Sequence, residues 1–516
     1  MSITSDPAIA FVGFMGAGKT RAARAAGRAL GIEPIDTDRV IEAELGEPLH
    51  VFFEREGEAA FRTVEERVAL EALAGGGVVA LGGGAVETPG VREALAGHVV
   101  AHCRVSEALA WDRAARSNRP LAANREEFRR RYEAREPVYE SIATAVLPRG
   151  GDDTGTAAAP WLSAMRTLPG VRMAWARTAS AEYPALIGSG ATGALAAAGA
   201  PRVGTRLFPI ADREALFAQP ALMPADHEAA IEVEGGEESK TVSALESTLA
   251  RLAAAGARRD DAVAAFGGGV VGDLAGFCAA IYQRGIPVVQ IPTTLVAQVD
   301  SAYGGKTGVD LPGAKNYVGA YHQPAAVLAD PAALATLPAE ELAAGYAEIV
   351  KTALIAGGEL WEQVRAGGPP RPQELEDVIF RCALTKLSVV AEDERDDGRR
   401  AVLNLGHTVG HAIETATAYG RYRHGEAVGL GLLAALRLSD AGQLREEVEA
   451  LFGAAGLPTK LDPSVDTDGV IDATAKDKKH TAEGLGFVLV SSPGDLRHGE
   501  RVGEADLRSA IEELRP

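Results

Sequence analysis

The chain has 516 residues, a formal net charge of −19 and a hydrophobic content of 47%. This length exceeds one ordinary domain and the hydrophobic content supports sizeable cores, so we expect two to four folded domains and no general disorder. Such an acidic chain lacks the basic face that nucleic-acid binding requires, which excludes nucleic acid as a partner. Three scattered cysteines predict reduced thiols and a cytoplasmic protein, and the absence of a long apolar run excludes a membrane partner.

Short apolar strands alternate with helical stretches through the first third of the chain. The strands are predicted at 8–12, 78–82 and 98–103, and GDDTG at 151–155 is interpreted as a polar turn. Leu-Pro-Gly at 168–170 is a stop signal. The pattern predicts a parallel sheet with helices on both faces, in a domain that covers residues 1–169.

The octapeptide GFMGAGKT at 13–20 satisfies GxxxxGK[ST] and lies between a predicted strand and helix. In such a loop the backbone N–H groups turn inward around nucleotide phosphates, here at Gly13, Gly16, Ala17 and Gly18. Lys19 would neutralise the β- and γ-phosphates, and Thr20 would bind Mg²⁺.

Two carboxylates follow in IDTD at 35–38. At a strand end they can divide the work, with Asp36 facing the magnesium and Asp38 facing a substrate hydroxyl. The spacing alone also suits a solvated helix cap.

Four further segments complete a set: FR at 61–62, LGGGA at 81–85, NRPL at 118–121 and REPVY at 135–139. With the phosphate loop, this set resembles shikimate kinase across residues 1–169. The resemblance implies that Arg119 comes from a lid and, with Lys19, binds ATP and offsets charge on the transferred phosphoryl group. The lid between Arg113 and Arg119 is short, which leaves open which arginine stacks on adenine. The implied shikimate-binding residues are Asp38, Arg62, Gly83, Gly84 and Arg135.

A second alternation of strands and helices runs from residue 170 to about 330. Its clearest strands are PALIG, DAVAAF, VVQIP and AVLAD, whereas long Ala/Leu/Glu stretches dominate beyond residue 331. We expect an α/β nucleotide-binding subdomain at 170–330 and a mainly α-helical, metal-binding subdomain at 331–516.

The glycine loop FGGGVVGD at 266–273 satisfies GxGxxG after a predicted strand. A pyrophosphate could approach this backbone, although a close-packed structural turn gives the same pattern. The segment at 291–310, which carries Thr293, Thr294, Asp300 and Lys306, favours ligand contact, as do the following Lys315 and Asn316.

His407 and His411 are four residues apart, and on a helix both imidazoles share one face. His424 follows, and an earlier helical segment places Glu348 and Lys351 on one side. A carboxylate and two imidazoles are the composition of a catalytic zinc site. The pattern alone leaves open which two histidines bind.

Over residues 170–516 the chain resembles 3-dehydroquinate synthase, through GGGVVGD, PTTLVAQVDS, GGKTGVD, KNYVG, YAEIVK, NLGHTVGHAIE, HGEAVGLG and DKK. The resemblance implies that zinc, or another divalent ion such as cobalt, is bound by Glu348, His407 and His424. The segment at 203–212 offers no clear acidic residue for the NAD ribose. The implied substrate-binding and catalytic residues are Arg284, Asn316, Lys351, Lys386, Arg400, Asn404, His411 and one of Lys478 and Lys479, with Lys306 also catalytic. The implied NAD-binding residues are Glu237, Lys240, Gly268, Gly269, Val270, Asp273, Thr293, Thr294, Asp300, Lys306, Lys315 and Thr336.

The two resemblances together predict a bifunctional shikimate-pathway enzyme. One half would phosphorylate shikimate with ATP and magnesium. The other would convert 3-deoxy-D-arabino-heptulosonate 7-phosphate to 3-dehydroquinate and phosphate, using zinc and NAD without net oxidation. We expect small-molecule substrates and a homo-oligomer formed through the synthase unit. The alternatives are a kinase for another small alcohol fused to a metal-dependent polyol dehydrogenase, and a binding module in which one half has lost catalysis.

Overall fold

The structure, a computed structural model, describes residues 6–115, 124–148, 150–199, 203–312, 314–478 and 486–516. The chain divides into two compact units. The N-terminal unit consists of Met1–Ala176 with Gly193–Ala200, and the C-terminal unit consists of Arg177–Thr192 with Pro201–Pro516. No helix in the described part of the chain is both long and apolar enough to cross a membrane.

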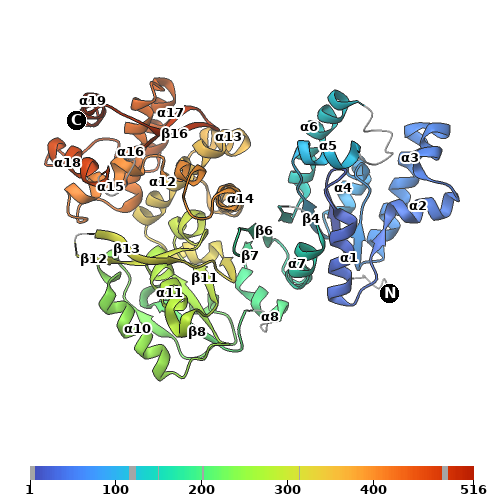
Figure 1. Ribbon diagram of the computed structural model, residues 1–516, viewed down its shortest axis with the longest axis horizontal. Helices are drawn as coiled ribbons and strands as arrows, with labels where there is room; N and C mark the ends of the chain where they lie inside the picture. Colours follow the sequence, from blue (N-terminus) through green and yellow to red (C-terminus); the bar gives the residue numbers. More distant parts are fainter. Residues whose placement is uncertain (1–5, 116–123, 149, 200–202, 313, 479–485) are drawn as a thin grey trace. The chain divides into compact units, whose positions relative to one another are not determined.

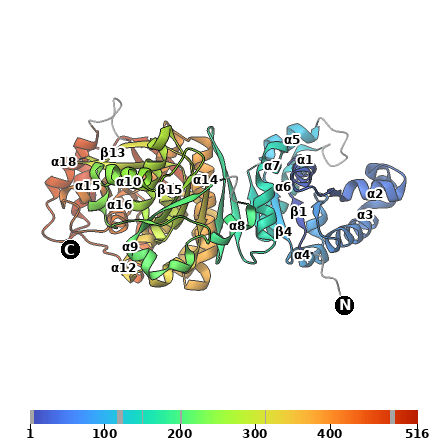
Figure 2. The same cartoon turned by 90° about the horizontal axis from the view of Figure 1, so that it is seen from below.

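The N-terminal unit is built on a parallel sheet with the strand order β2-β3-β1-β4-β5-β6. Strands β1, β3, β4 and β5 are buried along their whole length, as expected when helices cover both faces of a parallel sheet. Helices α2 and α3 lie side by side at one edge of this unit (Figures 1 and 2). The strands are β1 (Ile9–Val12), β2 (Ile35–Asp36), β3 (Val78–Ala80), β4 (Val99–Cys103), β5 (Ala145–Leu147) and β6 (Arg172–Arg177). The helices are α1 (Lys19–Leu30), α2 (Thr37–Leu45), α3 (Leu49–Ala74), α4 (Pro89–Leu95), α5 (Glu107–Ala115), α6 (Arg125–Ile142), α7 (Asp152–Met165) and α8 (Ala194–Ala198).

One element of this unit differs from the sequence prediction. GDDTG, interpreted above as a turn, forms the first turn of α7. Asp152 and Asp153 stand at the helix N-terminus, where a carboxylate interacts favourably with the helix dipole. Asp152 also pairs with Arg21 at 3.1 Å, which no local pattern could indicate.

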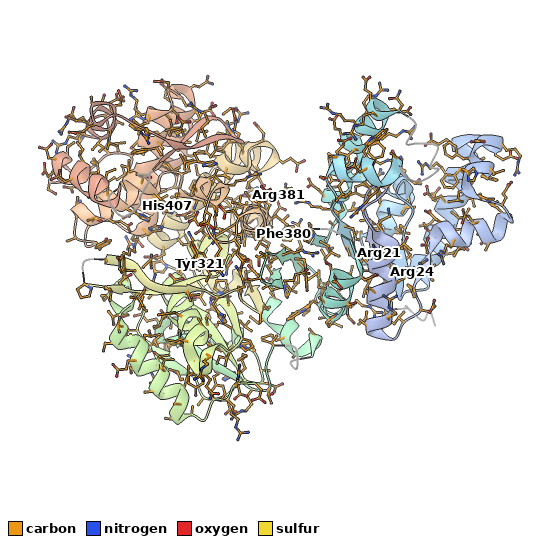
Figure 3. The ribbon with its side chains drawn as sticks, viewed as in Figure 1. Arg21, Arg24, Tyr321, Phe380, Arg381 and His407 are labelled. Atoms are coloured by element: carbon orange, nitrogen blue, oxygen red, sulfur yellow. The ribbon has the colours of Figure 1, made fainter. Side chains whose placement is uncertain are left out.

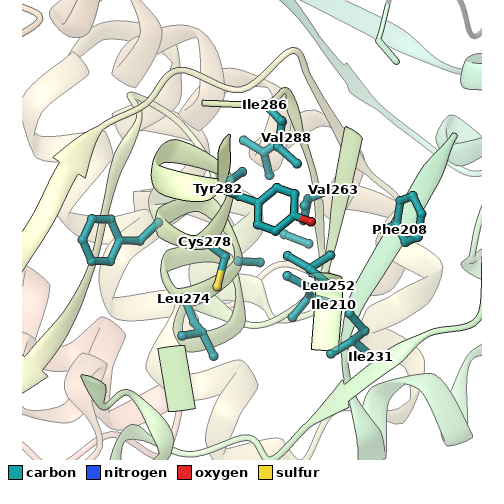
Figure 4. Packing of buried hydrophobic residues seen from close by; sticks show 14 of the residues in the cluster. Phe208, Ile210, Ile231, Leu252, Val263, Leu274, Cys278, Tyr282, Ile286 and Val288 are labelled. Atoms are coloured by element: carbon teal, nitrogen blue, oxygen red, sulfur yellow. The ribbon is translucent and has the colours of Figure 1, made fainter. Parts of the chain in front are cut away.

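The C-terminal unit begins with an α/β layer whose parallel sheet has the order β7-β14-β11-β10-β8-β9. Helices α10 and α11 pack on it through a buried cluster that includes Phe208, Val263, Leu274 and Tyr282 (Figure 4). The elements are β7 (Glu182–Ile187), β8 (Leu207–Asp212), α9 (Arg213–Ala218), β9 (Ile231–Val233), α10 (Val242–Ala254), β10 (Ala262–Gly267), α11 (Gly269–Ile281), β11 (Val288–Pro292) and β14 (Ala326–Ala329).

A helical layer completes the C-terminal unit and appears in orange and red beside the green and yellow α/β layer (Figure 1). Its helices are α12 (Ala339–Ala356), α13 (Gly358–Gly367), α14 (Leu375–Glu392), α15 (His407–Ala416), α16 (His424–Leu438), α17 (Gly442–Ala454), α18 (Thr467–Lys478) and α19 (Glu504–Glu512). Two antiparallel hairpins accompany the layers, β12 (Lys306–Leu311) with β13 (Ala314–Tyr321), and β15 (Phe487–Ser492) with β16 (Asp495–Glu500). Tyr321 of β13 donates to the carbonyl of Arg395 beyond α14, so the first hairpin joins the two layers.

Candidate active sites

The phosphate loop connects β1 to the N-terminus of α1. Gly13, Gly16 and Gly18 have φ values of 141°, 82° and 87°, which side chains rarely allow. At Gly13 a Cβ atom would stand 2.5 Å from the carbonyl oxygen of Cys103. Lys19 Nζ donates to the carbonyls of Gly13 (2.8 Å) and Phe14 (3.2 Å), so its charge lies over the loop. Backbone donors and the lysine therefore converge where an anion can bind.

The glycine triplet beside β3 faces this loop. The Gly82 N–H donates to Thr37 Oγ1 at 3.0 Å, and a Cβ at Gly82 would meet Asp38 Oδ1 at 2.8 Å. A Cβ at Gly83 would lie 3.7 Å from Lys19 Nζ. The turn thus lies against both Asp38 and Lys19, and Glu65 Oε1 also approaches it, 2.4 Å from the position of a Cβ at Gly82.

Asp36 ends β2 and its carboxylate accepts from the Arg39 N–H at 3.4 Å, so it caps α2. The cap was the alternative kept open for this residue, and its magnesium role remains a prediction. Thr20, the other predicted magnesium ligand, lies in the first turn of α1.

Two arginines, Arg62 and Arg135, lie near the glycine triplet and share a carboxylate partner. Arg135 is only 3% exposed and pairs with Glu87 at 2.5 Å. Arg62 pairs with Glu65 (2.5 Å), Glu58 (3.0 Å) and the same Glu87 (3.1 Å). Burial raises the pKa of Glu65, although Arg62 opposes the shift.

The arginine pair adjoins the glycine triplet, because a Cβ at Gly84 would collide with the Arg62 guanidinium. Arg113 donates to the Gly16 carbonyl at 2.6 Å, which places a guanidinium against the phosphate loop. The predicted lid residue Arg119 lies outside the described residues.

In the C-terminal unit the second glycine loop begins α11. Cβ atoms at Gly268 and Gly269 would stand 2.9 Å from Thr294 and 3.0 Å from Ser301, so the loop packs against the segment after β11. Lys240 Nζ contacts Asp273 and Asn316 at 2.5 Å each. Burial raises the pKa of Asp273 despite this lysine. The structure therefore gathers predicted NAD residues from three separate segments and places the predicted substrate residue Asn316 beside them.

The remaining predicted NAD residues are spread around this loop. Thr293 is buried at the end of β11, and Val270 lies in the first turn of α11. Thr336 Oγ1 accepts from Gln219, the residue that follows α9, at 3.3 Å. Glu237 and Lys315 pair with each other at 3.1 Å.

Asp212 is an acidic residue to which the sequence analysis gave no role. It is the last residue of β8, the strand beside β10. A Cβ at Gly267, the first glycine of the loop, would lie 3.1 Å from Asp212 Cβ, and one at Gly235 would lie 2.4 Å from Asp212 Oδ2. Segment 203–212 was expected to offer no clear acidic residue for the NAD ribose. It ends at Asp212, whose Oδ1 accepts from the Glu214 and Ala215 N–H groups and caps α9. An acidic residue at that strand end is where nucleotide-binding sheets contact a ribose.

The metal-ligand candidates come together in the helical layer. Glu348 of α12 is fully buried, and Oε1 has no hydrogen-bond partner among the residues that the structure describes. His407 Nε2 and His424 Nε2 lie 3.7 and 3.5 Å from this oxygen. Atoms that bind a tetrahedral zinc ion at about 2.1 Å are about 3.4 Å apart, so these three side chains fit such an ion. Burial, and then Lys351, lowers the pKa of His407 to about 3, which keeps the imidazole in the neutral form that binds metals.

His411 and Glu414 lie next to the two histidines of the candidate metal site. The ring of His411 is 5.3 Å from that of His407 and 5.9 Å from that of His424. Glu414 Oε1 lies 3.4 Å from His424 Nδ1 and 3.3 Å from Lys315 Nζ. Burial opposes ionisation of Glu414, but His424 and Lys315 outweigh it and lower its pKa to about 2. Glu414 is the last residue of the motif NLGHTVGHAIE, and the sequence analysis assigned it no role.

A buried group of cations adjoins the metal ligands. Lys351 Nζ lies 2.5 Å from Glu348 Oε2 and 3.4 Å from Asp300 Oδ1. Lys386 Nζ lies 2.9 Å from the same Asp300 carboxylate. Burial alone would raise the pKa of Asp300, but the two lysines hold it well below its ordinary value. Asp300 thus lies between the two lysine ammonium groups, and Glu348 pairs with one of them.

Other predicted substrate residues occupy the edges of this group. Arg400 is buried and donates to the carbonyls of Glu394 (2.6 Å) and Gly304 (3.0 Å), and Lys306 pairs with Asp396 at 2.5 Å. Asn404 ends the short 3₁₀ helix Arg399–Asn404, which precedes His407. His407 is labelled in the helical layer in Figure 3. Arg284 is exposed, with φ 74°, and no hydrogen bond or ion pair joins it to the cluster among the described residues. The side chain of Lys478, and Lys479 altogether, lie outside the described part.

Comparison with known proteins assigns both halves. Models of the N-terminal and C-terminal regions of 3-dehydroquinate synthase match residues 230–344 and 345–480. The 3-dehydroquinate synthase of Caulobacter vibrioides is 46% identical over 55% of this chain and 80% of its own. The chain belongs to the 3-dehydroquinate synthase family. The synthase of Halorhodospira halophila is 41% identical over 66% of this chain and 99% of its own.

The shikimate kinase model matches residues 15–165, so this member of the family also carries a shikimate kinase domain. The chain is therefore a bifunctional shikimate-pathway enzyme, a kinase and a cyclising, phosphate-eliminating synthase that act on small molecules. Among solved structures, a 2-deoxy-scyllo-inosose synthase complexed with carbaglucose-6-phosphate, NAD⁺ and Co²⁺ is 27% identical over 66% of this chain and 99% of its own, with a TM-score of 0.58. A 2-epi-5-epi-valiolone synthase from Streptomyces hygroscopicus with NAD⁺ and Zn²⁺ is 28% identical over 60% and 90%, with a TM-score of 0.56.

Proposed function

We propose that the two reactions use two separate sets of residues, one in each unit. The observation that carries the kinase half is the convergence of Lys19, Asp38 and Arg62 on the glycine triplet, with Arg135 joined to Arg62 through Glu87. The observation that carries the synthase half is the buried Glu348 oxygen that faces two imidazoles without a hydrogen-bond partner among the described residues.

In the kinase site, the backbone of residues 13–20 and Lys19 bind the ATP phosphates, while Thr20 and Asp36 hold Mg²⁺. Arg62, Arg135 and the backbone of Gly83 and Gly84 hold shikimate. Asp38 then accepts the hydroxyl proton as the hydroxyl oxygen attacks the γ-phosphorus and ADP leaves. Arg119 offsets charge on the transferred group, because phosphoryl transfer relies on position and electrostatics.

In the synthase site, Glu348, His407 and His424 hold a divalent ion, zinc or cobalt. When bound, the metal polarises a substrate hydroxyl and lowers its pKa. Bound NAD supplies the hydride acceptor. Gly268, Gly269, Val270, Thr293, Thr294 and Thr336 line its site, with Glu237, Lys240, Asp273 and Lys315 beside them. We add Asp212 to this set as the contact for a ribose hydroxyl.

The buried cations select an anionic substrate. Lys351, Lys386 and Arg400 supply positive charge that an incoming phosphate or carboxylate can share with Asp300. Asp300 and Lys306 would lie between substrate and cofactor, while His411, Asn404 and Asn316 would orient hydroxyl groups. A polyol dehydrogenase would not need this group of cations, because its substrate carries no phosphate.

One assay separates this function from the polyol alternative. With the sugar phosphate as substrate, the full chain should release one phosphate for each 3-dehydroquinate formed, with no net accumulation of NADH. Net NADH formation with a neutral polyol, and no phosphate release, would support the dehydrogenase instead. Metal analysis of the same protein should find a divalent ion bound at a ratio near one to the chain.

We further propose a cytoplasmic homo-oligomer assembled through the synthase unit. Its cysteines Cys103, Cys278 and Cys382 are buried and unpaired, as in a reducing compartment. Arg284, a predicted substrate residue, is exposed and outside the cluster of its own chain, where it could serve a neighbouring copy. Sedimentation analysis tests the assembly, and a monomer with full synthase activity would exclude it.

A further inference from the structure

Glu87 stands between the two arginines that are proposed to receive the shikimate carboxylate. Its Oε2 atom lies 2.5 Å from Arg135 Nη2 and 3.1 Å from Arg62 Nη2. Glu65 and Glu58 contact Arg62 but neither is paired with Arg135 among the described residues. Glu87 therefore makes the bridging contact that a substrate carboxylate would make on this pair.

The carboxylates around Arg62 and Arg135 already outnumber the two guanidinium groups. Two guanidinium groups face three carboxylates, from Glu58, Glu65 and Glu87, and 2 − 3 leaves one net negative charge. A further carboxylate would bring a second negative charge into this group, and like charges at such distances repel. An anionic substrate can bind strongly here only if one of the glutamates withdraws.

Glu87 is the one that can withdraw. Its side chain is 42% exposed, whereas that of Glu65 is 3% exposed and held beneath Arg62. Glu87 ends a short 3₁₀ helix at Ala85–Glu87, directly after the glycine triplet, so a rotation about its side-chain bonds carries the carboxylate into water. Arg135 is almost fully buried and stays in place.

We propose that Glu87 is an internal competitor of shikimate: its carboxylate contacts the two arginines and must rotate away when the substrate carboxylate binds them. This inference rests on the proposed roles of Arg62 and Arg135. Glu87 is a residue that sets substrate affinity, not a catalytic residue. It keeps the two guanidinium groups ordered in the empty site, and it raises the KM for shikimate without touching the reacting hydroxyl.

The test uses the full chain with Glu87→Gln, which removes the charge but keeps the size of the side chain. The KM for shikimate, and its Kd measured by calorimetry without ATP, should each fall about fivefold, the scale of a partly exposed ion pair. The kcat should stay within about twofold. The affinity for a neutral analogue, in which a primary alcohol replaces the shikimate carboxylate, should not change, because that analogue does not displace Glu87.

The matched control is Glu58→Gln, which removes an exposed carboxylate from Arg62 but not from Arg135. The fold-change in the KM for shikimate in Glu58→Gln should be less than half of that in Glu87→Gln. An unchanged or higher KM in Glu87→Gln, or an equal fall in the control, would overturn the inference. Arg135→Lys tests the proposed function separately and should raise the KM at least about tenfold through loss of the paired hydrogen bonds. If Arg135→Lys leaves the KM unchanged, the shikimate assignment itself fails.

Discussion

The phosphate loop of the N-terminal unit and the metal group of the C-terminal unit handle charge by different means. The loop uses consecutive residues, and its backbone conformation depends on glycines at positive φ. The metal group uses side chains from α12, α15 and α16, of which Glu348 is buried together with Lys351 while His407 and His424 are partly exposed. A main-chain site is thus specified locally, whereas a buried side-chain site needs several elements whose charges balance.

The largest effect that tests this comparison is expected from His407→Ala. Loss of one imidazole should release the metal and lower 3-dehydroquinate formation by about 10³-fold or more, since a bound ion contributes several kcal/mol to catalysis. Shikimate phosphorylation should stay unchanged. The measurements are metal content and both activities of the same preparation, and loss of both activities in a folded protein would show that the two sites are not independent.

Lys19→Ala tests the opposite half. Without the Nζ charge over the loop, phosphorylation of shikimate should fall by about 10²- to 10³-fold, the scale for one preorganised charge-stabilising donor. Synthesis of 3-dehydroquinate should be spared. Lys19→Arg serves as the control, because it keeps the charge. Full kinase activity in Lys19→Ala would contradict the phosphate-loop assignment.

A smaller effect should sharpen the description of the metal group. Glu414 lies against His424 Nδ1 and can hold Nε2 toward Glu348. Glu414→Gln should weaken metal affinity about 10- to 100-fold, as for other carboxylates that orient a metal-bound histidine. Titration of the metal-free protein with Co²⁺, followed by absorption, measures this directly. Glu426→Gln is the control, because this carboxylate lies on the same helix but caps it at Arg423 and is not paired with His424 among the described residues. Equal affinities in the two variants would remove Glu414 from the site.

The smallest effect concerns pH and the kinase unit. Burial, and then Glu140, raises the pKa of Glu136 from 4.5 to about 7 despite Arg104. The folded state therefore holds a proton that the unfolded state releases, so this contribution to stability is complete below pH 4.5 and is lost as pH rises through 7. Glu136→Gln should stabilise the unit by about 1 kcal/mol at pH 8, or about 2–4 °C, and by much less at pH 5. Calorimetry measures this change, and the transition of the kinase unit is identified as the one whose midpoint temperature rises when shikimate and ATP are added. Equal changes in midpoint temperature at pH 5 and pH 8 would contradict the mechanism.

Contiguous motifs carried most of what could be predicted. The loop at 13–20 is one continuous segment that leads into α1, and His407 and His411 lie on the single helix α15. Both patterns depend only on residues that are close in the sequence. Residues that act across elements were harder to find. Asp212 was missed because its meaning depends on β8 lying beside β10, and Glu414 because its partner His424 lies on the next helix. The prediction of a turn at GDDTG was wrong, because turns and the first turns of helices prefer the same residues.

The sequence by itself determined that this chain joins a phosphate-loop kinase to a second, metal- and nucleotide-dependent unit, because backbone-shaping glycines and helical spacing are local properties. Only the tertiary structure decided which carboxylate meets which cation. Glu87 on two arginines, Asp300 between two lysines and Glu348 facing two imidazoles are contacts between distant segments. Their strength depends on burial, and burial exists only after the layers have packed.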